Sequence, residues 1–154
     1  MANTYTQLNI HGIFTVSGRE CFLSDKLRPE LFKYISGILK NLEQYPLAVN
    51  GYKDHVHIFF ELNTTSSVSK IMQIIKTNSS KWINENKYFP GKFHWQTGYA
   101  AFSYSRSQRD IVINYIIKQE KHHAERSFKD EYLDLLKKFD IEYNDAYLFD
   151  FYDE

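Results

Sequence analysis

Hydrophobic positions along this chain switch between a spacing of two and a helical spacing, which predicts a mixed domain of strands and helices. Segments rich in branched and aromatic residues favour strands, and four such segments stand out: 5–16, 45–51, 55–62 and 95–105. Apolar residues at helical spacing mark four further segments: 29–41, 68–86, 107–121 and 130–139. The expected order is strand, helix, strand, strand, helix, strand, helix, followed by a short final helix.

This order is that of a ferredoxin-like split βαβ sheet with an added helix. We therefore expect an α+β fold with an antiparallel sheet, helices on one face and the added helix docked over it. Only residues 52–54 separate two of the strands, which indicates a hairpin. The chain contains no linker, repeat or low-complexity segment, so residues 1–154 are interpreted as a single domain, long enough to bury a core.

The strand at 55–62 carries two histidines, His55 and His57, on either side of Val56. Alternate residues of a strand point to the same face. Both imidazoles are therefore expected to lie side by side, close enough to share one metal ion. A bare His-x-His also fits two histidines at a sheet edge, or one that is buried and hydrogen-bonded. Asp54, just before the pair, is interpreted as a turn residue that points to the opposite face from His55.

A second motif lies on the helix at 107–121, where Tyr115 and Gln119 are four residues apart. That spacing predicts one helix face for a hydroxyl and an amide oxygen. A histidine pair on a strand with Tyr-x-x-x-Gln on a helix suits a metal-assisted tyrosine nucleophile, because the metal polarises a phosphate oxygen while the phenolate attacks phosphorus. Two imidazoles and the Gln119 oxygen leave coordination positions open, which suits Mg²⁺ or Mn²⁺.

At these motifs the chain resembles the single-tyrosine HUH transposases of bacterial insertion sequences, the TnpA type. The resemblance extends to most of the chain and includes the segments 10–19, 31–41, 95–103, 127–132 and 142–143. It implies a metal-dependent endonuclease and strand transferase that excises and integrates the insertion sequence. Its substrate would be single-stranded DNA at the hairpin-flanked ends of the element. Tyr115 would form a 5′-phosphotyrosine intermediate, with the metal held by His55, His57 and Gln119. It also implies a homodimer whose active sites are shared between subunits.

Two other functions remain compatible with the sequence. The first keeps the chemistry but places it in a repeat-element-associated or domesticated single-strand nuclease. The second is a non-catalytic DNA-binding relative that retains only the fold. The intact histidine pair, Tyr115 and Gln119 favour an enzyme over the second alternative.

Charge is distributed unevenly, although the formal net charge is zero. Residues 53–126 hold eleven Lys and Arg against six Asp and Glu, whereas residues 127–154 hold three against nine. The basic section carries both motifs, and a local positive field favours phosphate binding. The candidate DNA contacts are Lys70, Lys76, Lys81, Arg106, Arg109 and His122. An ordinary solvated face is the alternative, and His122 and His123 are interpreted first as surface histidines at a helix end.

Cysteine content and hydropathy point to the cytoplasm. Cys21 is the only cysteine, so no intrachain disulfide can form. No apolar run approaches the ~20 residues that span a bilayer, and the N-terminus is polar without a signal pattern. We therefore expect no membrane association.

Overall fold

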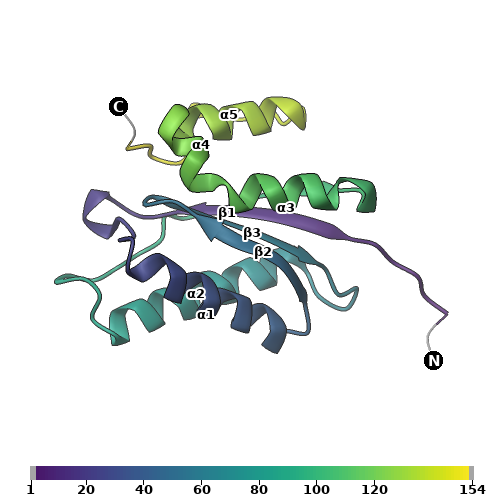
Figure 1. Cartoon of the computed structure of the whole chain (residues 1–154), viewed down its shortest axis with the longest axis horizontal. Helices are drawn as coiled ribbons and strands as arrows, with labels where there is room; N and C mark the ends of the chain where they lie inside the picture. Colours follow the sequence, from purple (N-terminus) through teal and green to yellow (C-terminus); the bar gives the residue numbers. More distant parts are fainter. Residues whose placement is uncertain (1–2, 153–154) are drawn as a thin grey trace.

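The computed structural model describes residues 3–152 and contains one four-stranded antiparallel sheet (Figure 1). Its strands are β1 (Asn9–Thr15), β2 (Tyr45–Gly51), β3 (His55–Glu61) and β4 (Ala100–Tyr104). They lie in the order β2-β3-β1-β4, with every neighbouring pair antiparallel. This is the order of a split βαβ sheet, so the predicted fold is confirmed.

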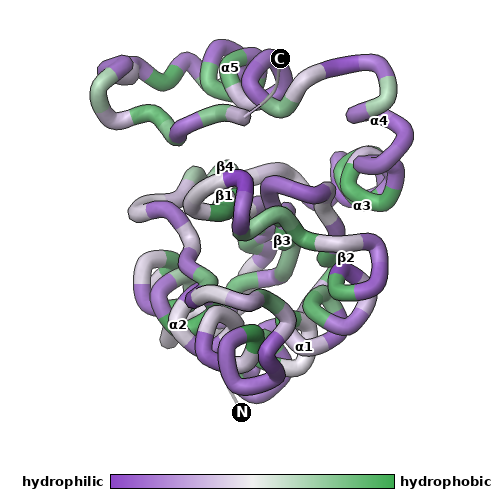
Figure 2. Tube along the Cα trace, turned by 90° about the vertical axis from the view of Figure 1, so that its left-hand side faces the viewer, coloured by the Kyte–Doolittle hydropathy of each residue, from purple (hydrophilic) through white to green (hydrophobic). Residues whose placement is uncertain are grey.

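Helices cover both faces of the sheet. On one face lie α1 (Leu27–Asn41) and α2 (Val68–Glu85) (Figure 1). On the other lie α3 (Arg109–Ile117), α4 (Gln119–Glu125) and α5 (Phe128–Lys138). Figure 2 shows the hydrophobic segments of the strands between these two helical layers. Among residues 3–152, no helix combines the length and the apolar character needed to cross a membrane.

Alternation along β3 supplies both layers. Val56, Ile58 and Phe60 are fully buried in the core that α1 and α2 share with the sheet. The intervening residues His55 and His57 are equally buried, on the opposite face. The period of two thus places the histidine pair beneath the second helical layer.

Two glycines hold the histidine strand in place. A Cβ at Gly51 would lie 2.2 Å from the carbonyl oxygen of His55, so the hairpin closes only around a residue without a side chain. A Cβ at Gly12 would lie 3.0 Å from both Ile58 and the Met72 sulfur, so α2 approaches β1 closely there.

The second layer is anchored by α5. Phe128, Tyr132 and Leu135 recur at helical spacing and are buried against Ile13 and Phe102 of the sheet. Burial of this stripe fixes α5 directly above β1 and β4. Any further residue on the same stripe must therefore also face the sheet.

Some element boundaries differ from the sequence expectation. The segment 107–121 is not one helix: the backbone leaves helical geometry at Lys118, which separates α3 from α4. The strand expected at 95–105 begins only at Ala100, and Trp95 makes an isolated bridge to Val16. The final helix begins at Phe128 because the Ser127 hydroxyl caps its first turn by accepting from the Asp130 N–H.

Candidate active site

His55 and His57 lie side by side beneath the second helical layer, with ring centroids 5.0 Å apart. Both side chains are fully buried. Their common face follows from strand alternation, and their burial follows from the helices above them. A buried imidazole needs a partner for each ring nitrogen, so the neighbours of these rings define the site.

Asp54 orients His55. The Asp54 carboxylate lies 2.7 Å from Nδ1 of His55 and accepts its N–H, which leaves Nε2 free to act as a ligand. Burial alone would lower the pKa of His55, but the hydrogen bond and charge of Asp54 raise it above the ordinary value. The Phe128 ring stacks on the imidazole at 3.8 Å, with 6° between the planes. The interpretation of Asp54 as a turn residue that faces away from His55 is therefore wrong, because Asp54 precedes the strand and does not follow its alternation.

His11 of β1 orients His57. Its Nε2 lies 2.8 Å from His57 Nδ1. Burial lowers the pKa of both rings, and the charge of His57 lowers that of His11 further, so both imidazoles are neutral at neutral pH. Nε2 of His57 has no hydrogen-bond partner among the described residues and points toward the second helical layer. In the tautomer that donates from Nδ1 to His11, His57 presents a lone pair at Nε2.

The carboxylate of Glu131, on α5, lies next to the Nε2 atoms of both histidines. Its Oε1 lies 3.3 Å from His57 Nε2 and 3.5 Å from His55 Nε2, and it lacks a hydrogen-bond donor among the described residues. The ligand atoms of His55, His57 and Glu131 all lie within 4.8 Å of one another. Burial opposes ionisation of Glu131, but the surrounding imidazoles outweigh it and hold the pKa of the carboxyl well below its usual range.

Sequence reasoning missed Glu131, although a signal was present. Glu131 follows Phe128 by three residues and precedes Leu135 by four, which places its carboxylate on the buried stripe of α5. A charged residue on an apolar stripe is costly without partners, so such a position points to a functional role.

Tyr115 and Gln119 converge on the other oxygen of Glu131. The Tyr115 hydroxyl donates to Oε2, and the Gln119 amide nitrogen donates to the same atom over 3.0 Å. The Tyr115 ring also lies edge-on to His57, with centroids 5.9 Å apart. Burial and the charge of Glu131 raise the pKa of Tyr115, so the phenol carries its proton. The predicted pair is thus beside the histidines despite the break at Lys118.

The two histidines of α4 differ in environment. The side chain of His123 is 3% exposed, and its Nε2 lies 3.0 Å from Gln119 Oε1. The expectation of a surface histidine is therefore wrong for His123. His122 is half-buried, and its ring lies 5.1 Å from the Tyr115 ring.

The residues around Glu131 fit a divalent cation. Carboxylate oxygen, amide oxygen and imidazole nitrogen are all recognised metal donors. Two buried atoms that could bind a metal, His57 Nε2 and Glu131 Oε1, have no hydrogen-bond partner among the described residues. Buried acceptors without donors are unfavourable unless a cation neutralises them. His55, His57, Gln119 and Glu131 could therefore hold a metal ion.

The three candidate lysines lie away from this site. Lys70, Lys76 and Lys81 belong to α2, which covers the opposite face of the sheet (Figure 1). The Lys76 ammonium donates to the backbone carbonyls of Gln96 and Gly98, and burial lowers its pKa. Lys81 lies 3.9 Å from Glu85, and Lys70 is exposed.

The candidate arginines lie at the start of the tyrosine helix. The Arg109 guanidinium forms an ion pair with Glu61 and donates to Asn9 Oδ1 over 2.9 Å. Arg109 therefore ties the start of α3 to the ends of the two central strands, β1 and β3. Arg106 is exposed in the short turn η2 (Arg106–Gln108).

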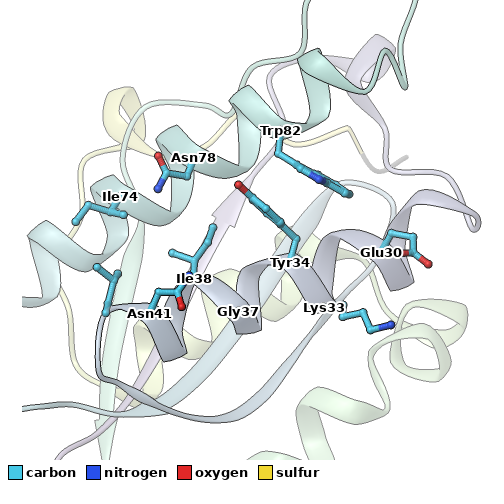
Figure 3. Close-up of a pocket in the computed structure, with 10 residues that line it drawn as sticks. Glu30, Lys33, Tyr34, Gly37, Ile38, Asn41, Ile74, Asn78 and Trp82 are labelled. Atoms are coloured by element: carbon cyan, nitrogen blue, oxygen red, sulfur yellow. The ribbon is translucent and has the colours of Figure 1, made fainter.

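A pocket of about 420 Å³ opens beside the tyrosine, between α3 and α5. Tyr115 and Glu131 line it, and basic side chains are supplied by Arg126 and Lys138. A separate groove of about 530 Å³ runs between α1 and α2, where the Tyr34 and Trp82 rings stack 4.8 Å apart (Figure 3). Of these two, the first pocket reaches the histidine site.

Two solved structures have a fold similar to that of this chain. A solved structure from Deinococcus radiodurans R1, described as a candidate transposase, matches with a TM-score of 0.62 and 18% identity, over 77% of this chain and 95% of that one. A REP-associated tyrosine transposase bound to a REP hairpin matches with a TM-score of 0.59 and 12% identity, over 80% of this chain and 73% of that one. At these identities the likeness shows the fold. No curated protein gives a significant match. The family model described as "Transposase IS200 like" matches residues 4–119, well over half of the chain, and the protein therefore belongs to the IS200-like transposase family.

Proposed function

We propose that this protein cleaves and rejoins single-stranded DNA through a covalent bond between Tyr115 and a 5′ phosphate. The reaction would serve excision and integration of an insertion sequence. The observation that carries the proposal is the carboxylate of Glu131, which faces the histidine pair with one oxygen and accepts the Tyr115 hydroxyl with the other. A nucleophile and a set of metal donors thus meet at one buried group.

The metal is proposed to be Mg²⁺ or Mn²⁺. His55, His57 and Glu131 would hold it, and Gln119 Oε1, 3.0 Å from His55 Nε2, is close enough to join them. When bound, the ion would neutralise charge on the scissile phosphate. The Asp54 carboxylate places the hydrogen of His55 on Nδ1, so that Nε2 can be a ligand. Nε2 of His57 is available in the tautomer that donates from Nδ1 to His11.

Tyr115 Oη would attack phosphorus and release the 3′ hydroxyl of the preceding nucleotide. One P–O bond forms as another breaks, so the bond energy is retained in the phosphotyrosine. Before the attack the phenolic proton is on Tyr115 Oη and is hydrogen-bonded to Glu131 Oε2, which would accept it as the phosphotyrosine forms. The departing 3′ oxygen takes up a proton and leaves as the hydroxyl. The 3′ hydroxyl of a second strand can reverse the step, which joins the strands without a nucleotide cofactor.

The proposed substrate is single-stranded DNA beside a hairpin. The REP-associated relative was captured with a REP hairpin, which supports a hairpin partner here. The pocket between α3 and α5 adjoins Tyr115 and carries Arg126 and Lys138, which could pair with backbone phosphate. Arg106 and His122 could extend this contact beyond the pocket. A fully paired duplex lacks the unpaired strand that this reaction would use, and we expect it not to be cleaved.

We also propose that the active unit is a homodimer in which each site combines residues of two chains. Within a single chain, Tyr115 already lies beside His57. A shared site would therefore require the segment from α3 onward to exchange with its equivalent. Such an exchange replaces contacts by identical ones, so it costs little in the folded state.

Incubation with 5′- and 3′-labelled single-stranded element ends and Mn²⁺ tests the chemistry. We expect a covalent protein–DNA adduct that retains the label downstream of the cut and survives denaturing electrophoresis. Tyr115→Phe should form none, whereas Tyr45→Phe, which alters an exposed tyrosine at the sheet edge, should match the wild type. Adducts formed equally well by Tyr115→Phe would rule out the proposed nucleophile.

The REP-associated relative favours one alternative role, processing of dispersed repeat hairpins. The same assay separates the two roles when ends that flank the protein's own gene are compared with repeat hairpins from elsewhere in the genome. Adducts confined to the dispersed repeats would assign the chemistry to repeat processing instead of transposition.

A further inference from the structure

His123 places a third imidazole at the metal site. Its Nε2 lies 3.3 Å from Glu131 Oε1, the same separation as that of His57 Nε2. The His123 ring also packs against the His55 ring, with centroids 4.7 Å apart. Resting on the metal-dependent function proposed above, we infer that His123 is a direct ligand, so that three imidazoles and one carboxylate form the centre and favour transition-metal ions over Mg²⁺.

Hydrogen bonding fixes the tautomer of His123. Its Nδ1 lies 2.9 Å from the backbone carbonyl oxygen of Arg126. A carbonyl only accepts, so Nδ1 carries the hydrogen and Nε2 of the neutral ring carries a lone pair. This is the arrangement that Asp54 imposes on His55, and it is the usual preparation of a histidine ligand.

Gln119 adds an amide oxygen to the acceptor atoms that surround the proposed metal position. Its amide nitrogen donates to Glu131 Oε2, which sets its carbonyl oxygen toward the imidazoles. That oxygen lies 3.0 Å from Nε2 of His55 and 3.0 Å from Nε2 of His123. Once both rings present a lone pair at Nε2, three acceptors face one another in a buried space. A cation among them would turn this repulsion into coordination.

The Glu131 carboxylate lies at a ligand-to-ligand distance from all three imidazoles. Glu131 Oε1 lies 3.3, 3.5 and 3.3 Å from the Nε2 atoms of His57, His55 and His123. Neighbouring ligands of an ion with bonds of about 2.0–2.2 Å are roughly 3.0–3.5 Å apart. The three separations from Glu131 Oε1 are therefore those of neighbouring ligands around one ion. The ligand atoms of His55, His57 and Glu131 already lie within 4.8 Å of one another, and His123 would complete the centre by moving toward the ion.

The orientation of His123 is held by its surroundings. Its ring stacks on Tyr52 of the β2–β3 turn, with centroids 5.3 Å apart and 13° between the planes. The break at Lys118 begins α4 at Gln119, so that Gln119 and His123, one turn apart, both face the site. His122, next in sequence, lies against Tyr115 instead.

The donor set determines the metal preference. Mg²⁺ favours oxygen ligands and retains its waters, whereas imidazole nitrogen suits Zn²⁺, Co²⁺ and Fe²⁺, and Mn²⁺ accepts both donor types. A centre with one more imidazole should thus bind Co²⁺ and Zn²⁺ far more tightly than Mg²⁺. Removal of His123 should weaken that preference.

The decisive measurement is Co²⁺ binding by the full chain, followed by calorimetry and by the visible absorption of the ion. We expect His123→Ala to lower Co²⁺ affinity at least about tenfold and to change the spectrum, with a much smaller effect on Mg²⁺. His122→Ala is the matched control and should leave Co²⁺ affinity and spectrum unchanged. An unaltered affinity and spectrum in His123→Ala would overturn the assignment.

His57→Ala separates this inference from the proposed function. If His57→Ala loses Co²⁺ binding and His123→Ala does not, His123 is not a ligand but the proposed metal site stands. If both variants bind Co²⁺ normally, the proposed metal site is wrong. Imidazole ¹⁵N spectra of the wild type provide a readout that needs no folded variant. Zn²⁺ should shift three Nε2 resonances, and a shift of only two would contradict the assignment.

Discussion

At the scale of single residues, the proposed metal site depends on side chains that contact the second ring nitrogen of each histidine. Asp54 fixes the hydrogen of His55 on Nδ1, and His11 contacts Nδ1 of His57. The pKa values of the two imidazoles are shifted in opposite directions, because Asp54 raises the pKa of His55 whereas burial lowers that of His57. Proton release on metal binding should therefore come chiefly from His55.

Metal affinity should consequently depend on pH with one dominant proton. The imidazolium form of His55 cannot bind a metal, so affinity rises as pH rises through its pKa, which lies above the ordinary value of about 6.5. Below that pKa we expect Mn²⁺ affinity to fall by about tenfold per pH unit, and above it to level off. Electron paramagnetic resonance of free Mn²⁺ measures this directly. A flat profile between pH 5 and 8, about the range in which histidine titrates, would contradict it.

Asp54→Asn tests the cause of that behaviour. The substitution removes the charge that raises the pKa of His55, so the midpoint of the pH profile should move to lower pH. Loss of this supporting hydrogen bond should also lower the plateau affinity by about 10–100-fold. Asp150→Asn, at an exposed position, is the control and should leave both quantities unchanged. The same midpoint in Asp54→Asn would show that another group releases the proton.

At the scale of elements, the tight end of the β2–β3 hairpin determines where His55 begins its strand. Gly51 permits the close approach of the His55 carbonyl, whereas a Cβ at Gly37 of α1 would meet no atom within 4 Å. The two glycines therefore have opposite roles, one required by packing and the other unfavourable in a helix.

Alanine at each glycine should give effects of opposite sign. Gly51→Ala must move the chain at His55, so we expect a loss of roughly 1–3 kcal/mol in the free energy of unfolding and weaker Co²⁺ binding. Gly37→Ala should gain about 0.5–1 kcal/mol and bind Co²⁺ normally. Urea denaturation of the metal-free proteins measures both, and equal stabilities of the two variants would refute this account of the hairpin.

The sequence predicts these elements better than it predicts the site. β2 coincides with the segment 45–51, and it ends at Gly51, where the hairpin turn begins. The break at Lys118 has no Pro or Gly to announce it, and it serves contacts that Gln119 and His123 make with distant residues. The position of Glu131 on the buried stripe of α5 is visible in the sequence, but only the folded chain shows that its partners are the histidines of β3.

At the scale of the whole molecule, the sheet separates two helical layers, and only one of them contributes to the proposed site. The site lies between the sheet and the layer of α3, α4 and α5, whereas α1 and α2 cover the other face (Figure 1). The Tyr115 and Glu131 side chains both come from the outer layer, and His55 and His57 come from the sheet. Exchange of that layer between two chains would thus move the nucleophile and the carboxylate together, while the histidines stayed behind.

Mixing two inactive variants tests this exchange. His57→Ala keeps the tyrosine, and Tyr115→Phe keeps the histidines, so a mixed dimer with shared sites contains one site with both groups intact. We expect adduct formation to return in the mixture, up to about half the wild-type level per mixed dimer, because one of its two sites is restored. The variants should be unfolded and refolded together, with mixed dimers isolated by two different affinity tags. Activity that stayed absent in those isolated dimers would show that Tyr115 serves the histidines of its own chain, as it does within the single chain.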